Sequence, residues 1–264
     1  MNRPERRSSL RGFRCYRLRG LLLTLLLAAI PSVTLAQDPK EILLAAFDNW
    51  RAESSHGLVE MVIKRTNSER RMTLESWTKG TDKALVRFIA PKRDAGNGTL
   101  QIGRSTWVYN PKLNQVIKLP ASAMSQSWMG SDFSYNDLAK SDQIIDDYTH
   151  KLIARQSSGG HRVFVIEAVP KRGKPIVWGK QVVGVRDDGV LMFEEFYDQR
   201  GRLVRKMTTD RIGVLGGRPY PVVLTMRTIA KKGQFTRITT KSAEFGIPLP
   251  AWVFTKSNLQ NPRT

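Results

Sequence analysis

Apolar residues recur at three- and four-residue spacing over positions 39–53, and this spacing predicts a helix there. The repeated positions are Ile42, Leu43, Ala46, Phe47 and Trp50. Asp38 is suited to cap the first turn, and the proline that follows it is suited to the first helical position. Because the apolar residues share one side of the helix, we expect that side to pack against a sheet.

After this helix, apolar residues fall at every second position, which is the spacing of strands. Val59, Met61 and Ile63 begin the series, and turns rich in Gly, Asn, Asp and Pro separate about eleven such segments up to Phe245. Antiparallel strands joined by short turns either close into a barrel or pack as two sheets. The chain lacks the regular strand–helix spacing of a parallel doubly wound sheet. We therefore expect a mainly β fold with flanking helices.

Two loops, 91–98 and 120–134, interrupt the strands. The longer loop carries four large apolar residues, Met124, Trp128, Met129 and Phe133. Such residues must be buried, either beneath an ordinary loop or against a ligand. Ser134 with Asp137 three positions later resembles a capping box, which predicts a short helix over 135–140.

The first 36 residues have the pattern of a secretory signal peptide. Seven arginines precede an apolar run over 21–30, and small residues follow up to Ala36. The run is about half of the roughly 20 residues that a spanning helix needs. We expect cleavage after Ala36, export to the periplasm, and a single mature domain over 37–264 that does not span the membrane.

The formal charge of the 264-residue chain is +20, and it is unevenly distributed. Loss of the leader removes seven arginines and one glutamate, which leaves +14. The stretch 199–241 holds eleven basic residues and one acid. We expect Arg205, Arg227, Arg237 and Lys241 to form a basic sheet surface, either solvated or facing anionic headgroups or an acidic partner. Export argues against nucleic acid as a partner.

The residue types needed for common catalytic and metal sites are scarce. The only cysteine, Cys15, lies in the leader, and none of the three histidines has metal-ligand spacing to another His or Cys. The chain has no Gly-x-Ser-x-Gly motif and no phosphate-binding glycine-rich loop. We therefore expect no catalytic activity, no metal site and no cofactor.

Several motifs nevertheless carry a family resemblance. They are the run LVRFIAP over 85–91, GTL over 98–100, TWVYNP over 106–111, QVIKL over 115–119 and QSWMGSDFSYNDL over 126–138. Together they resemble the periplasmic outer-membrane lipoprotein-sorting family, LolA-like, in a branch whose members are mostly uncharacterised.

The resemblance implies a half-open antiparallel β-barrel covered by an N-terminal helix and a short lid helix. It also implies a carrier that shelters lipid or lipoprotein acyl chains in an apolar cavity during transfer toward the outer membrane, and that meets an inner-membrane ABC-type or other envelope transporter. We expect the cavity or its lid to include Trp107, Tyr109, Met124, Trp128, Met129 and Phe133. The alternative is a non-catalytic accessory module that docks on an envelope transporter or an anionic membrane surface.

Overall fold

The computed structural model describes residues 38–139 and 142–263, so the predicted signal peptide lies outside the described residues. Helix α1 (Pro39–Arg51) begins where the apolar spacing predicted it. The carboxylate of Asp38 accepts a hydrogen bond of 2.9 Å from the backbone N–H of Lys40. The apolar side of α1 is buried at Ile42, Leu43 and Ala46. The predicted N-terminal helix is confirmed.

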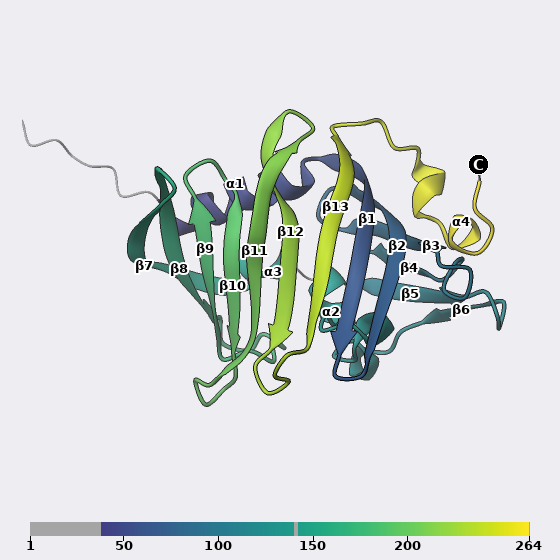
Figure 1. Cartoon of the computed structure of the whole chain (residues 1–264), viewed down its shortest axis with the longest axis horizontal. Coiled ribbons are helices and arrows are strands. Elements are labelled where there is room, and N and C mark those ends of the chain that lie inside the picture. Colours follow the sequence, from purple (N-terminus) through teal and green to yellow (C-terminus); the bar gives the residue numbers. More distant parts are fainter. Residues whose placement is uncertain (1–37, 140–141, 264) are drawn as a thin grey trace, which may run out of the picture. The chain divides into compact units, whose positions relative to one another are not determined.

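Thirteen strands follow and form one antiparallel sheet (Figure 1). Their bounds are β1 (Ser54–Arg65), β2 (Ser68–Lys79), β3 (Lys83–Ala90), β4 (Gly98–Ile102), β5 (Ser105–Asn110), β6 (Gln115–Lys118), β7 (Tyr148–Ser158), β8 (His161–Pro170), β9 (Lys180–Arg186), β10 (Leu191–Tyr197), β11 (Leu203–Leu215), β12 (Arg218–Thr228) and β13 (Phe235–Phe245). The number of strands is slightly higher than the predicted number of about eleven. One strand absent from the predicted series is β4, a five-residue strand in which the polar residues Thr99 and Gln101 are buried as well as Leu100.

The sheet is open, with β6 at one edge and β7 at the other. Every sequential pair of strands from β1 to β6 and from β7 to β13 is paired, and β1 pairs with β13 to join the two halves. The single connection from β6 to β7 therefore leads from one edge of the sheet to the other. It carries η1 (Ala121–Ala123), η2 (Trp128–Gly130), α2 (Tyr135–Ala139) and α3 (Gln143–Asp146).

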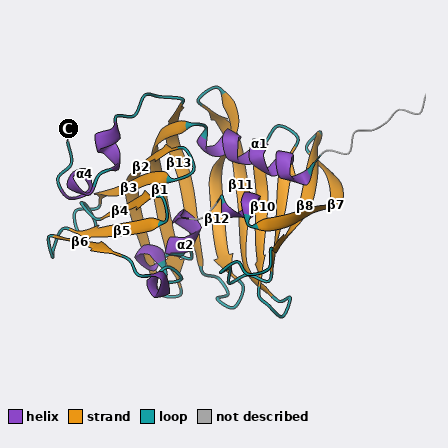
Figure 2. Cartoon of the chain, turned by 180° about the vertical axis from the view of Figure 1, so that it is seen from behind, coloured by secondary structure: helices purple, strands orange, loops and turns teal. Residues whose placement is uncertain are grey.

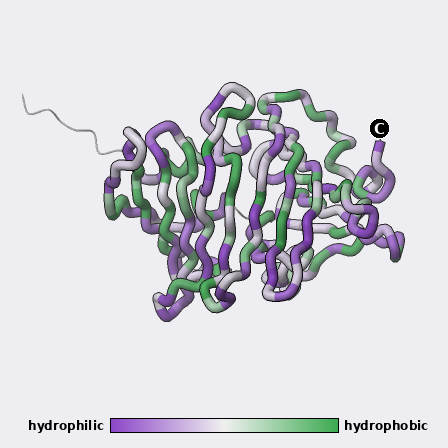
Figure 3. Tube along the Cα trace, in the orientation of Figure 1, coloured by the Kyte–Doolittle hydropathy of each residue, from purple (hydrophilic) through white to green (hydrophobic). Residues whose placement is uncertain are grey.

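Helices α1 and α2 lie on the same face of the sheet, which we call the inner face (Figure 2). Hydrophobic and hydrophilic residues are interspersed along the strands, as expected when the two faces have different surroundings (Figure 3). The half-open β-barrel with a covering N-terminal helix and a short lid helix is thereby confirmed. Among the described residues, no helix is long and apolar enough to cross a bilayer.

The opposite, outer face is covered at β3–β6 by the C-terminal segment, which carries η3 (Ala251–Phe254) and α4 (Lys256–Gln260). Leu85 and Leu100 of the sheet are fully buried against Phe254 and Leu259 of this segment. A Cβ on Gly98 would lie 2.6 Å from Leu259 Cδ1, so the absence of a side chain there permits this close approach.

Candidate functional site

Two cavities lie between the inner face and the segments that cover it. The first, which we call the α1 cavity, has a volume of about 200 Å³ and extends from α1 across β9–β12. Its walls include Leu43, Phe47, Val183, Leu224 and Met226. The second, which we call the β4 cavity, has a volume of about 230 Å³ and lies over β1–β5. Both are lined mostly by hydrophobic side chains.

The two cavities are neighbours. Trp50, Phe133, Asp137 and Ile238 line both of them. Phe133 and Asp137 belong to residues 120–139, which we call the lid. The lid therefore forms part of the wall between the cavities, and displacement of the lid would join them.

The lid is fixed to the sheet by Arg205 of β11. The guanidinium donates two hydrogen bonds to the carboxylate of Asp137, of 2.7 and 2.8 Å, and a third of 3.0 Å to the backbone carbonyl of Asp132. It also lies 4.8 Å from the ring centroids of both Trp178 and Phe196. A bidentate ion pair held between aromatic rings is a strong and directional contact.

A second attachment point is the carboxylate of Asp132, which is fully buried. It accepts hydrogen bonds from Arg65 at 3.0 Å, Thr236 at 2.7 Å and Thr228 at 3.1 Å. Because each of these partners lies on or beside a strand, the buried charge is compensated only when the lid is closed.

The capping box predicted at Ser134 is present. The carboxylate of Asp137 accepts a hydrogen bond of 2.6 Å from the backbone N–H of Ser134, and the Ser134 hydroxyl accepts one of 3.3 Å from the backbone N–H of Asp137. Asp137 therefore both starts helix α2 and binds Arg205. The same carboxylate therefore caps the lid helix and holds the lid against the sheet.

Of the apolar residues expected at the cavity or lid, Met124 and Trp128 of the long loop are buried, and Met129 and Phe133 are half-buried. Phe133 lines both cavities and Trp128 lines the β4 cavity. The Trp128 indole N–H donates a hydrogen bond of 3.1 Å to Thr99. Met129 packs against the same inner-face cluster as Trp128, and Met124 is buried within the lid.

Trp107 and Tyr109 lie elsewhere. Both pack against the C-terminal segment on the outer face, with Leu100 and Val253, and neither lines a cavity. The prediction that Trp107 and Tyr109 line the apolar cavity or its lid is therefore wrong. Side chains alternate along β5, so Thr106 faces the β4 cavity while Trp107 faces outward.

The basic residues are also divided between the two faces. Arg205 is buried at 8% exposure on the inner face, so its predicted place on a basic surface is wrong. It shares a face with Met207, which lines the α1 cavity. Arg227 and Lys241 are exposed and Arg237 is half-exposed; Arg237 lies 3.9 Å from the carboxylate of Asp210, and Lys241 lies 3.7 Å from that of Glu60.

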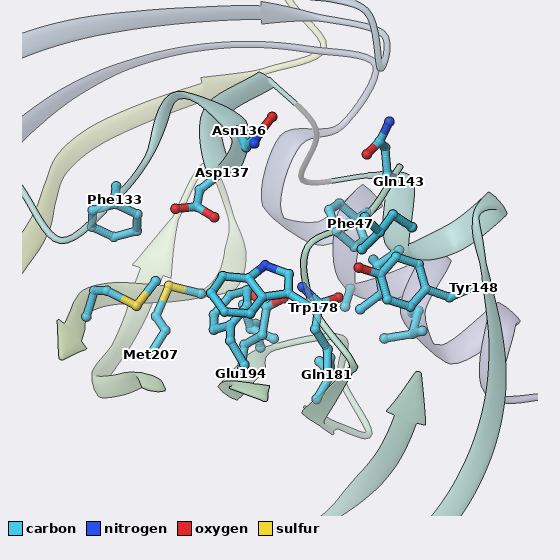
Figure 4. Close-up of a pocket in the computed structure, with 18 of the residues that line it drawn as sticks. Phe47, Phe133, Asn136, Asp137, Gln143, Tyr148, Trp178, Gln181, Glu194 and Met207 are labelled. Atoms are coloured by element: carbon cyan, nitrogen blue, oxygen red, sulfur yellow. The ribbon is translucent and has the colours of Figure 1, made fainter. Parts of the chain in front are cut away.

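Polar residues inside the α1 cavity are the feature that the sequence did not reveal. Tyr148, Gln181 and Glu194 line it from the sheet, and Asn136 and Asp137 line it from the lid (Figure 4). Burial, with a smaller contribution from the carboxylate of Asp137, raises the pKa of Glu194 to about 8, and Arg205 opposes the shift. Burial also raises the pKa of Tyr148, and Glu194 adds to that rise.

A signal for Glu194 was present in the sequence. Glu194 and Glu195 are adjacent on a strand, and neighbours on a strand face opposite sides. Glu195 faces outward, where it accepts hydrogen bonds of 2.7 Å from both Lys206 and Tyr197. Glu194 must then point inward, but alternation does not say which of the two faces is covered.

The described residues contain one group of three potential metal ligands, His161, Asp187 and Asp188. It lies away from the cavities. Asp188 already accepts a hydrogen bond of 2.8 Å from Arg186, and Asp187 accepts one of 2.8 Å from His161. These hydrogen bonds account for both carboxylates, so we assign no metal to this group.

Comparison with solved structures identifies the fold. A DUF1329 family protein from Desulfovibrio piger superposes with a TM-score of 0.76 at 24% identity, over 84% of this chain and 99% of that one. A domain described as an outer membrane lipoprotein-sorting protein from Vibrio parahaemolyticus gives 0.74 at 24% identity, over 84% and 98%. A LolA superfamily protein from Nitrosomonas europaea gives 0.69 at 22% identity, over 83% and 98%.

No curated protein matches the sequence. A family model described only as an uncharacterized protein matches residues 80–261, which is more than half of the chain. The chain therefore belongs to this uncharacterised family, and it has the fold of the LolA-like outer-membrane lipoprotein-sorting proteins.

Proposed function

We propose that this protein is a periplasmic carrier that shelters the alkyl chains of a lipid or lipoprotein during transfer toward the outer membrane. The observation that supports the proposal is the pair of mostly apolar cavities beneath a lid that polar contacts hold shut. Each CH₂ group moved from water into such a space contributes about 0.8 kcal/mol, so long chains need few polar contacts. A carrier of this kind requires no catalytic residue.

The lid suggests how such a carrier would load and release its cargo. The contacts of Asp132 and Asp137 are few and lie close together in sequence, so displacement of one segment breaks them together. Because Phe133 lines both cavities, the same displacement would join them into one larger space. A partner in the envelope, such as an inner-membrane transporter, would be suited to drive this step.

Native mass spectrometry of the protein purified from its own periplasm tests the proposal. We expect bound lipid, and uptake of labelled lipid by the stripped protein. Ile238 lines both cavities, so Ile238→Trp should reduce uptake strongly. Val214→Trp, at a side chain that is 71% exposed, is the matched control and should leave uptake unchanged. Consistently lipid-free protein that takes up no lipid would contradict the proposal.

The alternative is an accessory module that docks on an envelope transporter or an anionic membrane surface. Exposed Arg227 and Lys241 on the outer face support it, together with the half-exposed Arg237. In that case, reversing these charges abolishes function, whereas a carrier with an independent cavity keeps its lipid.

A further inference from the structure

The α1 cavity contains polar groups that simple alkyl chains would not satisfy. Within residues 38–139 and 142–263, the side-chain oxygens of Gln181 and Asn136 are buried and accept no hydrogen bond. Within the same described ranges, the Glu194 carboxyl forms no ion pair and no hydrogen bond. All three line the cavity. Buried polar groups in native proteins are nearly always paired, because an unpaired one costs about 1–3 kcal/mol.

The three groups surround one space. Gln181 pairs across the strands with Phe196, and Val183 pairs with Glu194, so Gln181 and Glu194 are diagonal neighbours on the inner face. Asn136 lies across the cavity from them, on α2 (Figure 4). The side chains of all three residues therefore line the space between the lid and the sheet.

The chemistry of this cluster favours a ligand that donates hydrogen bonds and carries positive charge. The unpaired atoms of Gln181 and Asn136 are acceptors, and an ionised Glu194 is an acceptor as well. Arg205 forms its salt bridge with Asp137, whereas Glu194 forms none among the described residues. The aromatic side chains of Phe47, Trp50 and Trp178 complete the lining, and aromatic surfaces favour ammonium groups.

We propose that the α1 cavity binds a lipid whose polar end carries a primary ammonium group, held by Glu194, Gln181 and Asn136. Such a group has three N–H donors, one for each acceptor, and its charge balances that of Glu194. The inference rests on the proposed carrier function and specifies the polar end of the cargo. The alkyl chains would occupy the apolar remainder of the cavity.

Dodecylamine and dodecanol, which share one chain length, serve as probes. Trp50 and Trp178 line the cavity, so intrinsic fluorescence reports binding. At pH 7.5 we expect dodecylamine to bind about tenfold more tightly than dodecanol, the effect of one charge-assisted hydrogen-bond network. Glu194→Gln should remove this preference. Glu195→Gln, the same substitution on the neighbouring outward-facing residue, should keep the preference.

The preference should also depend on pH. Glu194 must lose its proton to pair with an ammonium group, and burial holds its pKa at about 8 in the empty cavity. The ratio of the two affinities should therefore increase between pH 6 and 8 in the wild type and stay constant in Glu194→Gln. An apolar pocket without this role for Glu194 gives a constant ratio in both proteins.

The outcomes separate this inference from the carrier proposal. Equal binding of the two probes by the wild type, or an unchanged preference in Glu194→Gln, overturns the ammonium site while leaving a carrier of alkyl chains intact. If neither probe binds, the carrier proposal and the ammonium site both fail. If dodecanol binds more tightly than dodecylamine, the cavity recognises a neutral polar group and the inference is wrong.

Discussion

Arg205 holds the lid through a carboxylate, Asp137, that is itself mostly buried. The two side chains are only 10% and 14% exposed. Removal of one partner from a buried pair leaves an uncompensated charge, and this costs more than the pair contributes by itself. The single contact between Arg205 and Asp137 is thus a sensitive point of the whole lid.

Arg205→Met is expected to lower the free energy of unfolding by about 3 kcal/mol or more, because Asp137 then lacks its cation. Combination with Asp137→Asn should recover part of the loss. Denaturant unfolding measures both effects, and hydrogen exchange should show faster exchange in the lid than in β8 and β9. Arg202→Met, at a side chain that is 70% exposed, is the control and should cost less than about 1 kcal/mol.

Glu194 is expected to make stability depend on pH. Asp137 of α2, Arg205 of β11 and Tyr148 of β7 are the ionisable groups that influence or are influenced by its charge. Its pKa is about 8 in the folded protein against 4.5 in its ordinary state, so the folded chain binds more protons between these values. Stability should therefore fall as the pH increases from about 4.5 to 8, by an amount on the order of a few kcal/mol.

Thermal unfolding of the wild type and of Glu194→Gln at several pH values measures this contribution. The difference in stability between the two proteins should shift in favour of Glu194→Gln as the pH increases, and should level off above about pH 8. A difference that is constant from pH 5 to 8.5 would show that the carboxyl ionises as it does in water.

At the scale of elements, the two faces of the sheet are covered in different ways. On the inner face, α1 and the lid leave cavities, and the lid is attached both by polar contacts and by the apolar packing of Trp128. On the outer face, the C-terminal segment forms a closed apolar cluster with β3–β6. We expect the lid to open more readily than the C-terminal segment detaches, because the cavities leave part of the inner side of the lid without packed neighbours.

Leu259 of α4 tests this difference. It is 1% exposed, and its truncation to alanine leaves a void against Gly98. Leu259→Ala should cost about 2–5 kcal/mol in denaturant unfolding without changing lipid uptake. Leu113→Ala, at a turn residue that is 59% exposed, should have little effect on stability. Loss of uptake in stable Leu259→Ala would show that the outer cluster participates in binding.

At the scale of the whole molecule, charge and cavity are on opposite faces. Arg227 and Arg237 flank the ring of Phe235, at 5.9 and 5.0 Å from its centroid, while the cavities open on the inner face. Contact with an anionic surface and shelter of a lipid are therefore separable properties of this fold.

Simultaneous reversal of Arg227, Arg237 and Lys241 to glutamate measures the first property. Sedimentation with vesicles rich in anionic lipid should fall strongly, and the wild-type binding should itself weaken as salt is added. Lipid occupancy in native mass spectra should remain at the wild-type level. Parallel loss of occupancy in a folded variant would mean that the outer surface is required for loading.

Much of this architecture can be predicted from the spacing of apolar, polar and capping residues along short segments of the sequence. The spacing of Ile42, Leu43 and Ala46 predicted α1, and the pair Ser134 and Asp137 predicted α2, since caps and amphipathic spacing act over a few residues. Alternation predicted a mainly β chain, and the motifs over 85–138 indicated the family fold. Strand β4 was not among the predicted strands; it has five residues, and four of them are buried.

The sequence by itself thus determined most of the strands, helices α1 and α2, and the apolar character of the lid. Only the tertiary structure decided which face of each strand is the inner one. Alternation has a period of two and distinguishes two faces without saying what covers either. Trp107 and Tyr109 lie on the outer face, where they pack against the C-terminal segment. Arg205 and Glu194 lie on the inner face, where Arg205 binds the lid and Glu194 lines the α1 cavity. These contacts join residues that are far apart in the sequence, so no local sequence pattern predicts them.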